Sequence, residues 1–458
     1  MKEIRILAAS SQLGAGYLES SLKRGLDHDP HCIGCDAGST DTGPHPLGTG
    51  IGTFSDTSIK RDLRHMLLGR HAKKIPMIIG SCGTSGNNFG LESMRRIVLE
   101  IAKEEGLNFR LATIRSELSP EYLKQKYRDN KMRPLSAAPE ISEASIDRST
   151  HIVGMMGYEP IAKALDAGAD VVLAGRSSDT ALFAAFPMLH GGNPGPIWHA
   201  AKIIECGASC CVARKRPDSI LAWIRDDHFD VEPMDPENRV TAQSVASHSL
   251  YENADPYLLL EPGGVVDTRE STYEQVNDRI VRVYGSKFNR SDEYTIKLEG
   301  VEPLGWQHVI ISGVNDPYIL RQLDNWLDGM REKMKERVIE MFSGALRLDE
   351  YDIHVRVYGR DGVMGPLTPE ANRIMPHEVG LIFTITAPTE EQSYSIAKIF
   401  AHLASHYPIA EWSGLITGLA FPFSPFVLNK GESHIFNINH VVVPDDPYEM
   451  FPTEFEKV

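Results

Sequence analysis

The sequence predicts an α/β protein: a doubly wound, mostly parallel sheet at the N-terminus, followed by a smaller α+β domain. Over the first 215 residues, short apolar runs alternate with amphipathic stretches, which is typical of a parallel sheet with helices on both faces. After about residue 215, Asp and Pro become frequent and short strand patterns follow one another. A chain of 458 residues is too long to fold around one small hydrophobic core. We therefore expect one domain over residues 1–215 and a second over residues 216–458 that completes a crevice.

In the first half, the strand candidates are short apolar runs that end in turn-forming residues. They are Ile4–Ala9, Ile75–Gly80, Phe109–Ile114, His151–Gly154 and Val171–Gly175. Helices are expected at Tyr17–Arg24 and Glu92–Glu105, and in the second of these the apolar residues recur at intervals of three and four. The prediction of a parallel sheet is based on this alternation of strands and helices.

In the second half, the strand candidates follow one another with fewer helical patterns between them. They are Gly264–Asp267, Ile280–Tyr284, Tyr294–Leu298, Ile353–Tyr358 and Glu378–Ala387. Helices are expected at Tyr318–Phe342 and Glu391–His406. Successive strands without crossover helices indicate a largely antiparallel sheet.

Composition excludes several classes of protein. The hydrophobic fraction is 42% and the charged fraction 24%, as in ordinary globular chains. The net charge of −15 and the absence of a Lys/Arg block argue against a nucleic-acid partner. No apolar run reaches the roughly 18 residues that could span a membrane, and the N-terminus begins a strand pattern rather than a signal peptide. We expect a cytoplasmic protein, without a membrane partner, whose six scattered cysteines are reduced.

Three turn-rich stretches carry most of the candidate chemistry: Cys35–Pro44, Gly80–Gly86 and Gly175–Thr180. Residues such as Gly, Pro, Asp, Ser and Thr favour loops because they form turns or bond their own backbone. The second and third stretches follow apolar runs and precede helical patterns, which places them at the carboxyl ends of strands. Parallel sheets bind ligands at that edge. We therefore expect the three loops to meet at one crevice.

The first loop contains two carboxylates, Asp36 and Asp41, and the hydroxyls of Ser39, Thr40 and Thr42. A carboxylate held by backbone N–H groups could act as an acid or base, or help to hold a cation. The alternative is that both aspartates only cap turns. We take Asp36 and Asp41 as catalytic candidates, and Ser39 and Thr40 as substrate-binding candidates.

The second loop combines small residues with free N–H groups ahead of a helix, which suits a carboxylate or phosphate. On this basis Gly83, Thr84 and Ser85 are substrate-binding candidates. The loop lacks the Gly-Lys-Ser/Thr of a P-loop. Cys82 could be a nucleophile if its pKa were depressed, but a small, inert residue that happens to be Cys is the commoner outcome.

In the third loop, Arg176 follows an apolar strand, where a long cation needs a partner. Its guanidinium could clamp a substrate carboxylate in two bonds, or form an internal salt bridge to Asp179 or another carboxylate. Ser177 beside it is a further substrate-binding candidate, and Asp179 is a candidate acid or base.

Three acid–base candidates lie further along the chain. Glu205 closes a helical pattern, and His248 and Glu252 are four residues apart, which on a helix would place them on one face. Such a pair could bind substrate or supply a second acid or base, although an exposed ion pair is the commoner outcome. Cys32 and Cys35 have a C-x-x-C spacing, but no second pair completes a zinc site, so we interpret the spacing as coincidence.

Several blocks of the sequence resemble the acyclic terpene utilisation family. The blocks are Asp36–Pro44 with Leu47–Gly50, Ala167–Arg176 with Asp179, Ile204–Ala208, and Leu250–Tyr257. They occur in the family's order and span most of residues 3–290. The resemblance implies a role in breaking down branched acids and acyl-CoA esters, and a small companion protein as a second subunit.

The first functional hypothesis is an enzyme acting on a small carboxylic acid or acyl-CoA ester, most simply a lyase of hydratase or dehydratase type, or else an isomerase. Adding or removing water beside a carbonyl needs both an acid and a base, and a divalent cation such as Mg²⁺ could sit on the aspartates. The second hypothesis is a non-catalytic ligand-binding subunit that works with the companion protein. A third is a hydrolase with Cys82 or Ser85 as nucleophile. From base rates we expect a homo-oligomer.

Overall fold

The computed structural model describes residues 3–369, 375–410 and 417–458. The chain forms two compact units, and the second is an insertion into the first: unit 1 comprises residues 1–302 and 436–458, and unit 2 comprises residues 303–435. The boundary expected near residue 215 falls inside unit 1. The reason is that the strands following residue 215 extend the N-terminal sheet instead of starting a new one.

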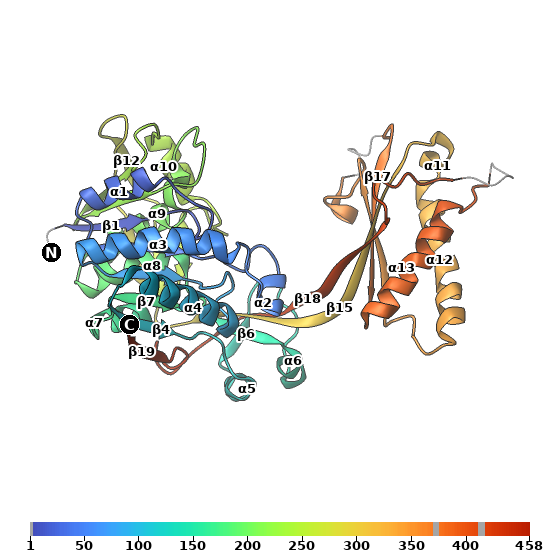
Figure 1. The fold of residues 1–458 in the computed structure, drawn as a ribbon, viewed down its shortest axis with the longest axis horizontal. Helices are drawn as coiled ribbons and strands as arrows, with labels where there is room; N and C mark the ends of the chain where they lie inside the picture. Colours follow the sequence, from blue (N-terminus) through green and yellow to red (C-terminus); the bar gives the residue numbers. More distant parts are fainter. Residues whose placement is uncertain (1–2, 370–374, 411–416) are drawn as a thin grey trace. The chain divides into compact units, whose positions relative to one another are not determined.

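Unit 1 is built on a ten-stranded sheet (Figure 1). Five adjacent central strands are parallel, in the order β1 (Ile4–Ala8), β2 (Cys32–Asp36), β3 (Met77–Gly80), β7 (Val171–Ala174) and β4 (Arg110–Ile114). Antiparallel strands extend both edges: β8 (Ile220–Ile224), β9 (His228–Pro233), β13 (Val281–Tyr284) and β12 (Thr272–Gln275) beyond β1, and β19 (Thr453–Lys457) beyond β4. The α/β class is confirmed, but the sheet is mixed rather than mostly parallel throughout.

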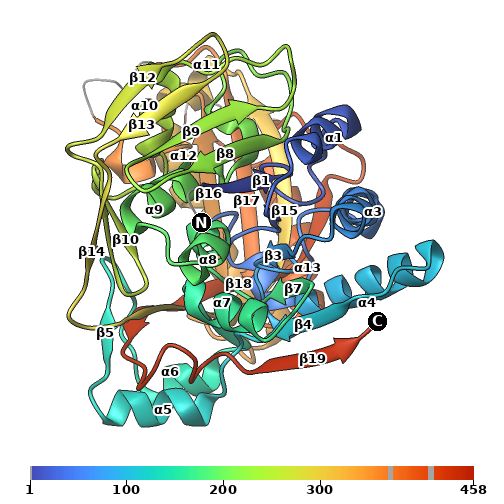
Figure 2. The same ribbon diagram turned by 90° about the vertical axis from the view of Figure 1, so that its left-hand side faces the viewer.

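Helices cover both faces of this sheet (Figure 2). On one side are α1 (Glu19–Asp27), α3 (Asp56–Lys73) and α4 (Asn88–Glu105); on the other are α7 (Tyr158–Asp166), α8 (Asp179–Leu189) and α9 (Pro194–Ile204). Each side has its own apolar core, because successive residues of a strand point to opposite faces. In β2, Cys32 belongs to one core and Cys35 to the other. The two thiols of the C-x-x-C spacing are therefore buried on opposite faces of the sheet and do not form one site.

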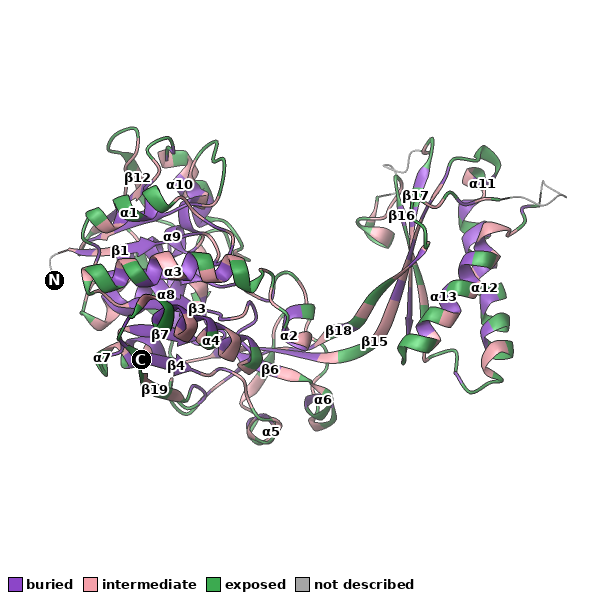
Figure 3. Ribbon diagram, in the orientation of Figure 1, coloured by how far each residue is buried: buried purple, intermediate pink, exposed green. Residues whose placement is uncertain are grey.

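The burial pattern of the outer helices follows from this arrangement (Figure 3). In α4, Met94, Ile97, Val98 and Ile101 are buried against the sheet, as their helical spacing predicted. The helix starts at the Asn87 side chain, which accepts a bond from the Gly90 N–H, and ends at Gly106 in the left-handed conformation.

Smaller elements complete unit 1. They are α2 (His45–Thr49), α5 (Pro120–Arg128), α6 (Glu143–Arg148), α10 (Ala242–Ser249), and a three-stranded sheet of β10 (Leu258–Glu261), β11 (Gly264–Asp267) and β14 (Lys287–Arg290). The predicted strand His151–Gly154 forms as β6, but it pairs antiparallel with β15 (Ile296–Val314) and lies outside the parallel sheet. Its four residues show the apolar run but not the partner.

Unit 2 is an antiparallel sheet covered by helices. Its strands are β16 (Asp352–Tyr358), β17 (Val379–Ala387), and the parts of β15 and β18 (Val427–Val442) that lie within residues 303–435. The other ends of β15 and β18 belong to unit 1, where β18 pairs with β5 (Met132–Pro134).

The core of unit 2 lies between this sheet and its helices. Alternate residues of β17, among them Leu381, Phe383 and Ile385, pack with Phe400 and Ala401 of α13 (Glu390–Ser405) and with α12 (Leu323–Phe342). The helix predicted over residues 318–342 is divided into α11 (Pro317–Arg321) and α12. Throughout the described residues, no helix combines the length and the apolar character needed to cross a membrane.

Candidate functional site

The three turn-rich loops meet at one edge of the unit 1 sheet. They follow β2, β3 and β7, which are neighbouring parallel strands, so their carboxyl ends lie side by side. Backbone bonds join the loops directly: Ala37 N–H donates to Gly80 O at 2.9 Å, and Ser81 N–H donates to Gly175 O at 3.0 Å. The three loops therefore meet at one edge of the sheet, as expected, but only the first and third loops line the cavities there.

A cavity of about 430 Å³ opens at this edge, within the size range of small-molecule sites. Its lining combines loop residues with residues from the end of α9 and from α10: Ser11, Gln12, Asp36, Gly38, Ser39, Asp41, Thr42, Asp179, Glu205, Cys206, Ser209, Arg214, His248, Tyr251 and Glu252. An adjoining cavity of about 560 Å³ shares Asp41, Asp179, Glu205 and Glu252, and adds Arg176, Ser178, Lys202 and Glu261. Residues from distant parts of unit 1 thus line one space.

Asp36 ends β2 and is buried, with 5% of its surface exposed. Its Oδ2 accepts a hydrogen bond of 2.7 Å from the Gly38 N–H. Its Oδ1 is buried and has no hydrogen-bond partner in the described part of the chain. Burial, and next the charge of Asp179, raise the pKa of Asp36 well above its usual range, although Arg176 opposes this. Asp36 therefore favours the protonated form more than an exposed aspartate does.

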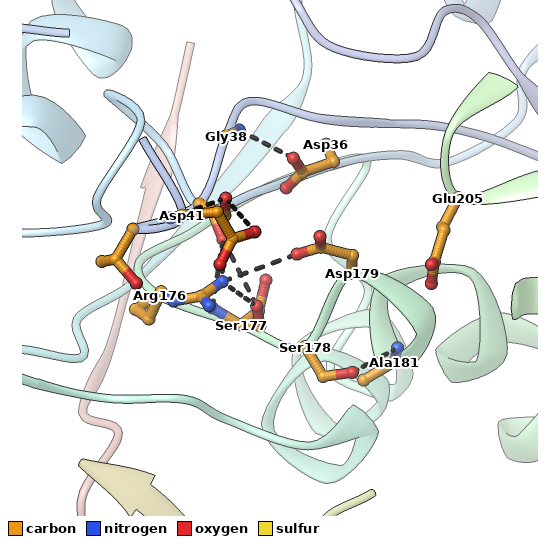
Figure 4. A network of polar contacts seen from close by, with 12 residues as sticks. Asp36, Gly38, Asp41, Arg176, Ser177, Ser178, Asp179, Ala181 and Glu205 are labelled. Atoms are coloured by element: carbon orange, nitrogen blue, oxygen red, sulfur yellow. Dashed lines mark hydrogen bonds and ion pairs between the residues drawn. The ribbon is translucent and has the colours of Figure 1, made fainter. Parts of the chain in front are cut away.

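Asp179 is the first residue of α8, and the helix begins there because the Ser178 hydroxyl accepts a bond from Ala181 N–H at 3.3 Å. Its Oδ1 lies 3.5 Å from the Arg176 guanidinium. Burial raises the pKa of Asp179 to about 7, with Arg176 opposing the shift and Glu205 adding to it. Figure 4 shows Asp36, Asp179 and Arg176 directed toward the same space.

Arg176 is buried and engaged within the protein. Its Nε donates to Glu299 Oε2 at 2.8 Å, and its Nη1 donates to Ser177 O at 3.0 Å. Glu299 also accepts a bond from Thr40 Oγ1 at 2.7 Å. Burial alone would raise the pKa of Glu299, but Arg176 and Lys297 lower it to about 2. Of the two alternatives for Arg176, the structure favours the internal ion pair, and Thr40 binds Glu299 and does not line the cavity.

Glu205 follows the last residue of α9 and is buried. Both of its oxygens are held: Thr180 Oγ1 donates at 2.5 Å, and Lys202 Nζ lies 2.5 Å away. Burial raises the pKa of Glu205, while Lys202 opposes this. Nearby, Glu261 accepts a bond of 2.5 Å from the Ser178 hydroxyl, and burial raises its pKa to about 7.

His248 and Glu252 both line the cavity, but they do not share a helix face. Helix α10 ends at Ser249, and Glu252 has a positive φ of 60° beyond it. The His248 ring stacks on Tyr251 with 5.7 Å between centroids, and its Nε2 has no hydrogen-bond partner within the described ranges. Burial lowers the pKa of His248 to about 4, so the ring is neutral at physiological pH.

The remaining candidates of the first and third loops divide between the cavity and the interior. Ser39 Oγ donates to Asp41 Oδ2 at 2.7 Å in an exposed turn at the cavity wall. Ser177 is buried, and its Oγ has no hydrogen-bond partner among the described residues. The contact between Ser39 and Asp41 is of the kind expected if Asp41 caps a turn, and both residues also line the cavity.

The Gly80–Gly86 loop does not line either cavity as the described residues define them. A Cβ on Gly83 would lie 2.2 Å from Gly90 Cα, so this glycine serves close packing. Thr84 Oγ1 accepts a bond from Thr53 N–H at 2.9 Å, and Ser85 Oγ donates to Pro46 O at 3.3 Å. The structure therefore offers no support for substrate binding by these three residues.

The nucleophile assigned to this loop has the same difficulty. Cys82 is fully buried in the apolar core beneath the sheet, and burial raises the pKa of its thiol. A neutral, inaccessible thiol is a poor nucleophile. Neither Cys82 nor Ser85 reaches the cavity, and the hydrolase hypothesis gains nothing from the structure.

Several residues of the site were not identified from sequence. Lys202 had a usable signal, because it precedes Glu205 by three residues on a helical pattern. Glu261, Glu299 and Arg214 had none, since each reaches the site only through tertiary pairing or a loop.

The divalent cation expected on the aspartates stays a prediction. In residues 3–369, 375–410 and 417–458, no three or more His, Cys, Asp or Glu side chains form a group that could hold a metal ion.

Comparison with known proteins gives one match. The family model described as acyclic terpene utilisation family protein AtuA matches residues 55–214 and 229–417. The matched ranges include Arg176, Asp179, Glu205 and His248, whereas Asp36 lies ahead of them. No curated protein and no solved structure matches the chain.

Proposed function

The chain belongs to the acyclic terpene utilisation family, and on that premise we propose that it is a catabolic lyase of hydratase or dehydratase type. Its substrate would be a small carboxylic acid or an acyl-CoA ester. The family match covers most of the chain and supports the catabolic setting, and the reaction class rests on the site.

One observation carries the proposal: Asp36 and Asp179 line one cavity, burial raises the pKa of both carboxyls, and the charge of Asp179 raises that of Asp36 further. Two coupled carboxyl groups in a buried site share protons, because ionising both is costly. Near neutral pH, with the pKa of Asp179 at about 7, one group can be protonated while the other is ionised. That is the state that acid–base catalysis needs.

The step we propose uses both forms. In dehydration, the ionised carboxylate removes the proton from the carbon beside the carbonyl. The protonated carboxyl gives its proton to the leaving hydroxyl, which departs as water, and the electrons of the C–H bond form the double bond. Hydration is the reverse. Each turnover leaves the pair with one proton, although the proton has moved from one carboxyl to the other and must return.

The surrounding residues hold this pair in place. Arg176, fixed by Glu299, keeps a positive charge 3.5 Å from Asp179 Oδ1. Lys202 and Thr180 hold both oxygens of Glu205. These groups are already satisfied by internal contacts, so their proposed role is to set the charge and position of Asp179 rather than to transfer protons.

A binding screen followed by turnover tests the proposal. Di- and tricarboxylic acids, hydroxy acids and acyl-CoA esters would be added singly to the purified protein, with and without Mg²⁺ or Mn²⁺, and the melting temperature recorded. A ligand at about 100 times its Kd adds about 2.7 kcal/mol of stability. We expect a hydroxy acid or its unsaturated counterpart to stabilise the protein and to be interconverted. Binding without interconversion would contradict the lyase and favour the companion-dependent subunit.

A further inference from the structure

The smaller cavity has an unbalanced set of charges. Among its described lining residues are five carboxylates and one guanidinium, that of Arg214. An acidic ligand entering such a space meets repulsion unless a cation compensates its charge. The identity of the available cation therefore bears on which ligands the cavity accepts.

The other cations near the site are already paired. Arg176 lies 2.8 Å from Glu299 and 3.5 Å from Asp179, and it is buried. Lys202 lies 2.5 Å from Glu205, and it is buried as well. A substrate carboxylate could recruit either cation only by displacing a protein carboxylate of like charge, which gains little.

Arg214 differs from both. It lies in the loop after the 3₁₀ turn Gly207–Cys210, is exposed, and makes no ion pair with any described residue. Its Nη1 donates a bond of 2.5 Å to Ser209 Oγ, and Ser209 also lines the cavity. This bond orients the guanidinium at the wall while leaving its other N–H groups for a ligand.

The cavity also contains polar atoms that lack partners. Asp36 Oδ1 and His248 Nε2 are buried and make no hydrogen bond within the described residues, and Asp36 and His248 are 5% and 9% exposed. Buried polar atoms in native proteins are nearly always bonded. Asp36 and His248 line the same cavity as Arg214, so these atoms could bond to a polar ligand that also reaches the Arg214 guanidinium.

We propose that Arg214, oriented by Ser209, binds the carboxylate of the substrate, so that the substrate is a free hydroxy acid. This inference rests on the proposed function. The cavity of about 430 Å³ suits a small molecule with the carboxylate at the Arg214 wall and the reacting carbon near Asp36 and Asp179. Guanidinium binds carboxylate through two parallel N–H bonds, whereas a thioester carbonyl offers one neutral acceptor.

The test measures binding of a set of 3-hydroxy acids, their neutral methyl esters and their CoA thioesters by calorimetry. The variants are Arg214→Gln, Arg214→Lys and Arg216→Gln. Arg216 is the matched control, because it is an exposed arginine of the same loop that lines neither cavity. Losing a charged hydrogen bond weakens binding by about 10- to 100-fold.

We expect Arg214→Gln to weaken acid binding by that factor and to leave ester binding unchanged. Arg214→Lys should recover part of the affinity, since it keeps the charge but loses the fork. Arg216→Gln should bind like the wild type. Equal affinity of wild type and Arg214→Gln for the acids would overturn the proposal, as would tighter wild-type binding of thioesters than of acids.

These outcomes are separable from failure of the proposed function. If the acids bind through Arg214 but are not interconverted, carboxylate binding by Arg214 is supported and the lyase proposal is contradicted. If the acids are interconverted with an unchanged KM in Arg214→Gln, the lyase proposal is supported and carboxylate binding by Arg214 is contradicted. If the wild type binds no acid, carboxylate binding by Arg214 is contradicted as well.

Discussion

The loops after β2 and β7 differ from the loop after β3, although all three look alike in sequence. The first two leave Asp36 Oδ1 and Ser177 Oγ buried without hydrogen-bond partners in the described chain, and they direct Asp36 and Asp179 into a cavity. The loop after β3 directs its hydroxyls inward, where Thr84 and Ser85 have backbone partners. Turn-forming composition thus identifies loops at strand ends. Whether such a loop forms a binding site or only packs in the interior depends on whether its polar side chains face the cavity or bond to the backbone.

The largest expected effect comes from removing the charge of the pair. Asp36→Asn and Asp179→Asn should each lower kcat by about 10²- to 10⁴-fold, the usual contribution of a general acid or base. Ser85→Ala, in the inward-facing loop, should leave kcat unchanged. Steady-state kinetics on the acid found by the screen, with calorimetry to show retained binding, measures this. A kcat loss in Ser85→Ala equal to that in Asp36→Asn would remove the distinction between the loops.

The second effect concerns folding. A Cβ on Gly86 would lie 2.0 Å from Arg176 N, and Gly86 has a φ of +70°, so Gly86→Ala must shift backbone and should cost about 3 kcal/mol or more. Gly43 also has a positive φ, but nothing lies within 4 Å of its added Cβ. Gly43→Ala should therefore cost only about 1–2 kcal/mol. Urea unfolding compares the two variants, and equal losses of stability would show that the loop after β3 is not tightly packed against its neighbours.

The third effect is a pH dependence of stability. The pKa of Asp179 is about 7 in the folded protein against an ordinary value of 3.8, so the folded state binds more protons between these values. Its contribution to the free energy of unfolding therefore falls as pH rises from about 4 to 7, and stays low above that. In Asp179→Asn this fall should be absent, which makes the profile shallower than that of the wild type. Superimposable profiles in urea unfolding would refute the raised pKa.

The smallest effect compares two serines. Ser85 Oγ donates to Pro46 O, so Ser85→Ala should cost about 0.5–1.5 kcal/mol. Ser177 Oγ is buried without a partner in the described residues, so Ser177→Ala should cost less or stabilise the free protein. Chemical denaturation without ligand provides both values. A larger loss for Ser177→Ala would indicate that its hydroxyl is satisfied within the protein.

Much of the fold follows from local sequence patterns. The strands β1, β3 and β7 and the helix α4 come from apolar runs and helical spacing, which depend on neighbouring residues. Strand β2 was not predicted, and its last two residues, Cys35 and Asp36, were assigned to a loop. Strand pairing does not follow from such local patterns. β6 was expected in the parallel sheet because it contains a short apolar run, but its partner is β15, about 150 residues later in the sequence. Likewise, the pairing of β8 with β1, by which β8 and β9 extend the first sheet, could not be predicted from local sequence.

The site was predictable to a similar extent. Asp36, Asp41, Asp179 and Glu205 are brought to one cavity. The three aspartates could be found because turn chemistry at strand ends is a local property, whereas Glu205 lies at the end of helix α9. The internal ion pair was one of the two roles expected for Arg176, but its partner Glu299 could not be identified from the sequence, because the contact joins residues 123 positions apart. The pairing of His248 with Glu252 on one helix face was wrong because α10 ends at Ser249. Where a helix ends depends in part on how the residues that follow it pack.

The most direct measurement of the central claim is isotope exchange in D₂O with the wild-type protein and the hydroxy acid that binds best, followed by NMR. We expect deuterium at the carbon beside the carbonyl together with loss or gain of water in the wild type, and neither in Asp36→Asn or Asp179→Asn. If the acid binds in the cavity but its C–H bonds stay unexchanged and no water is lost or gained, Asp36 and Asp179 are not an acid–base pair, and the chain is a binding subunit.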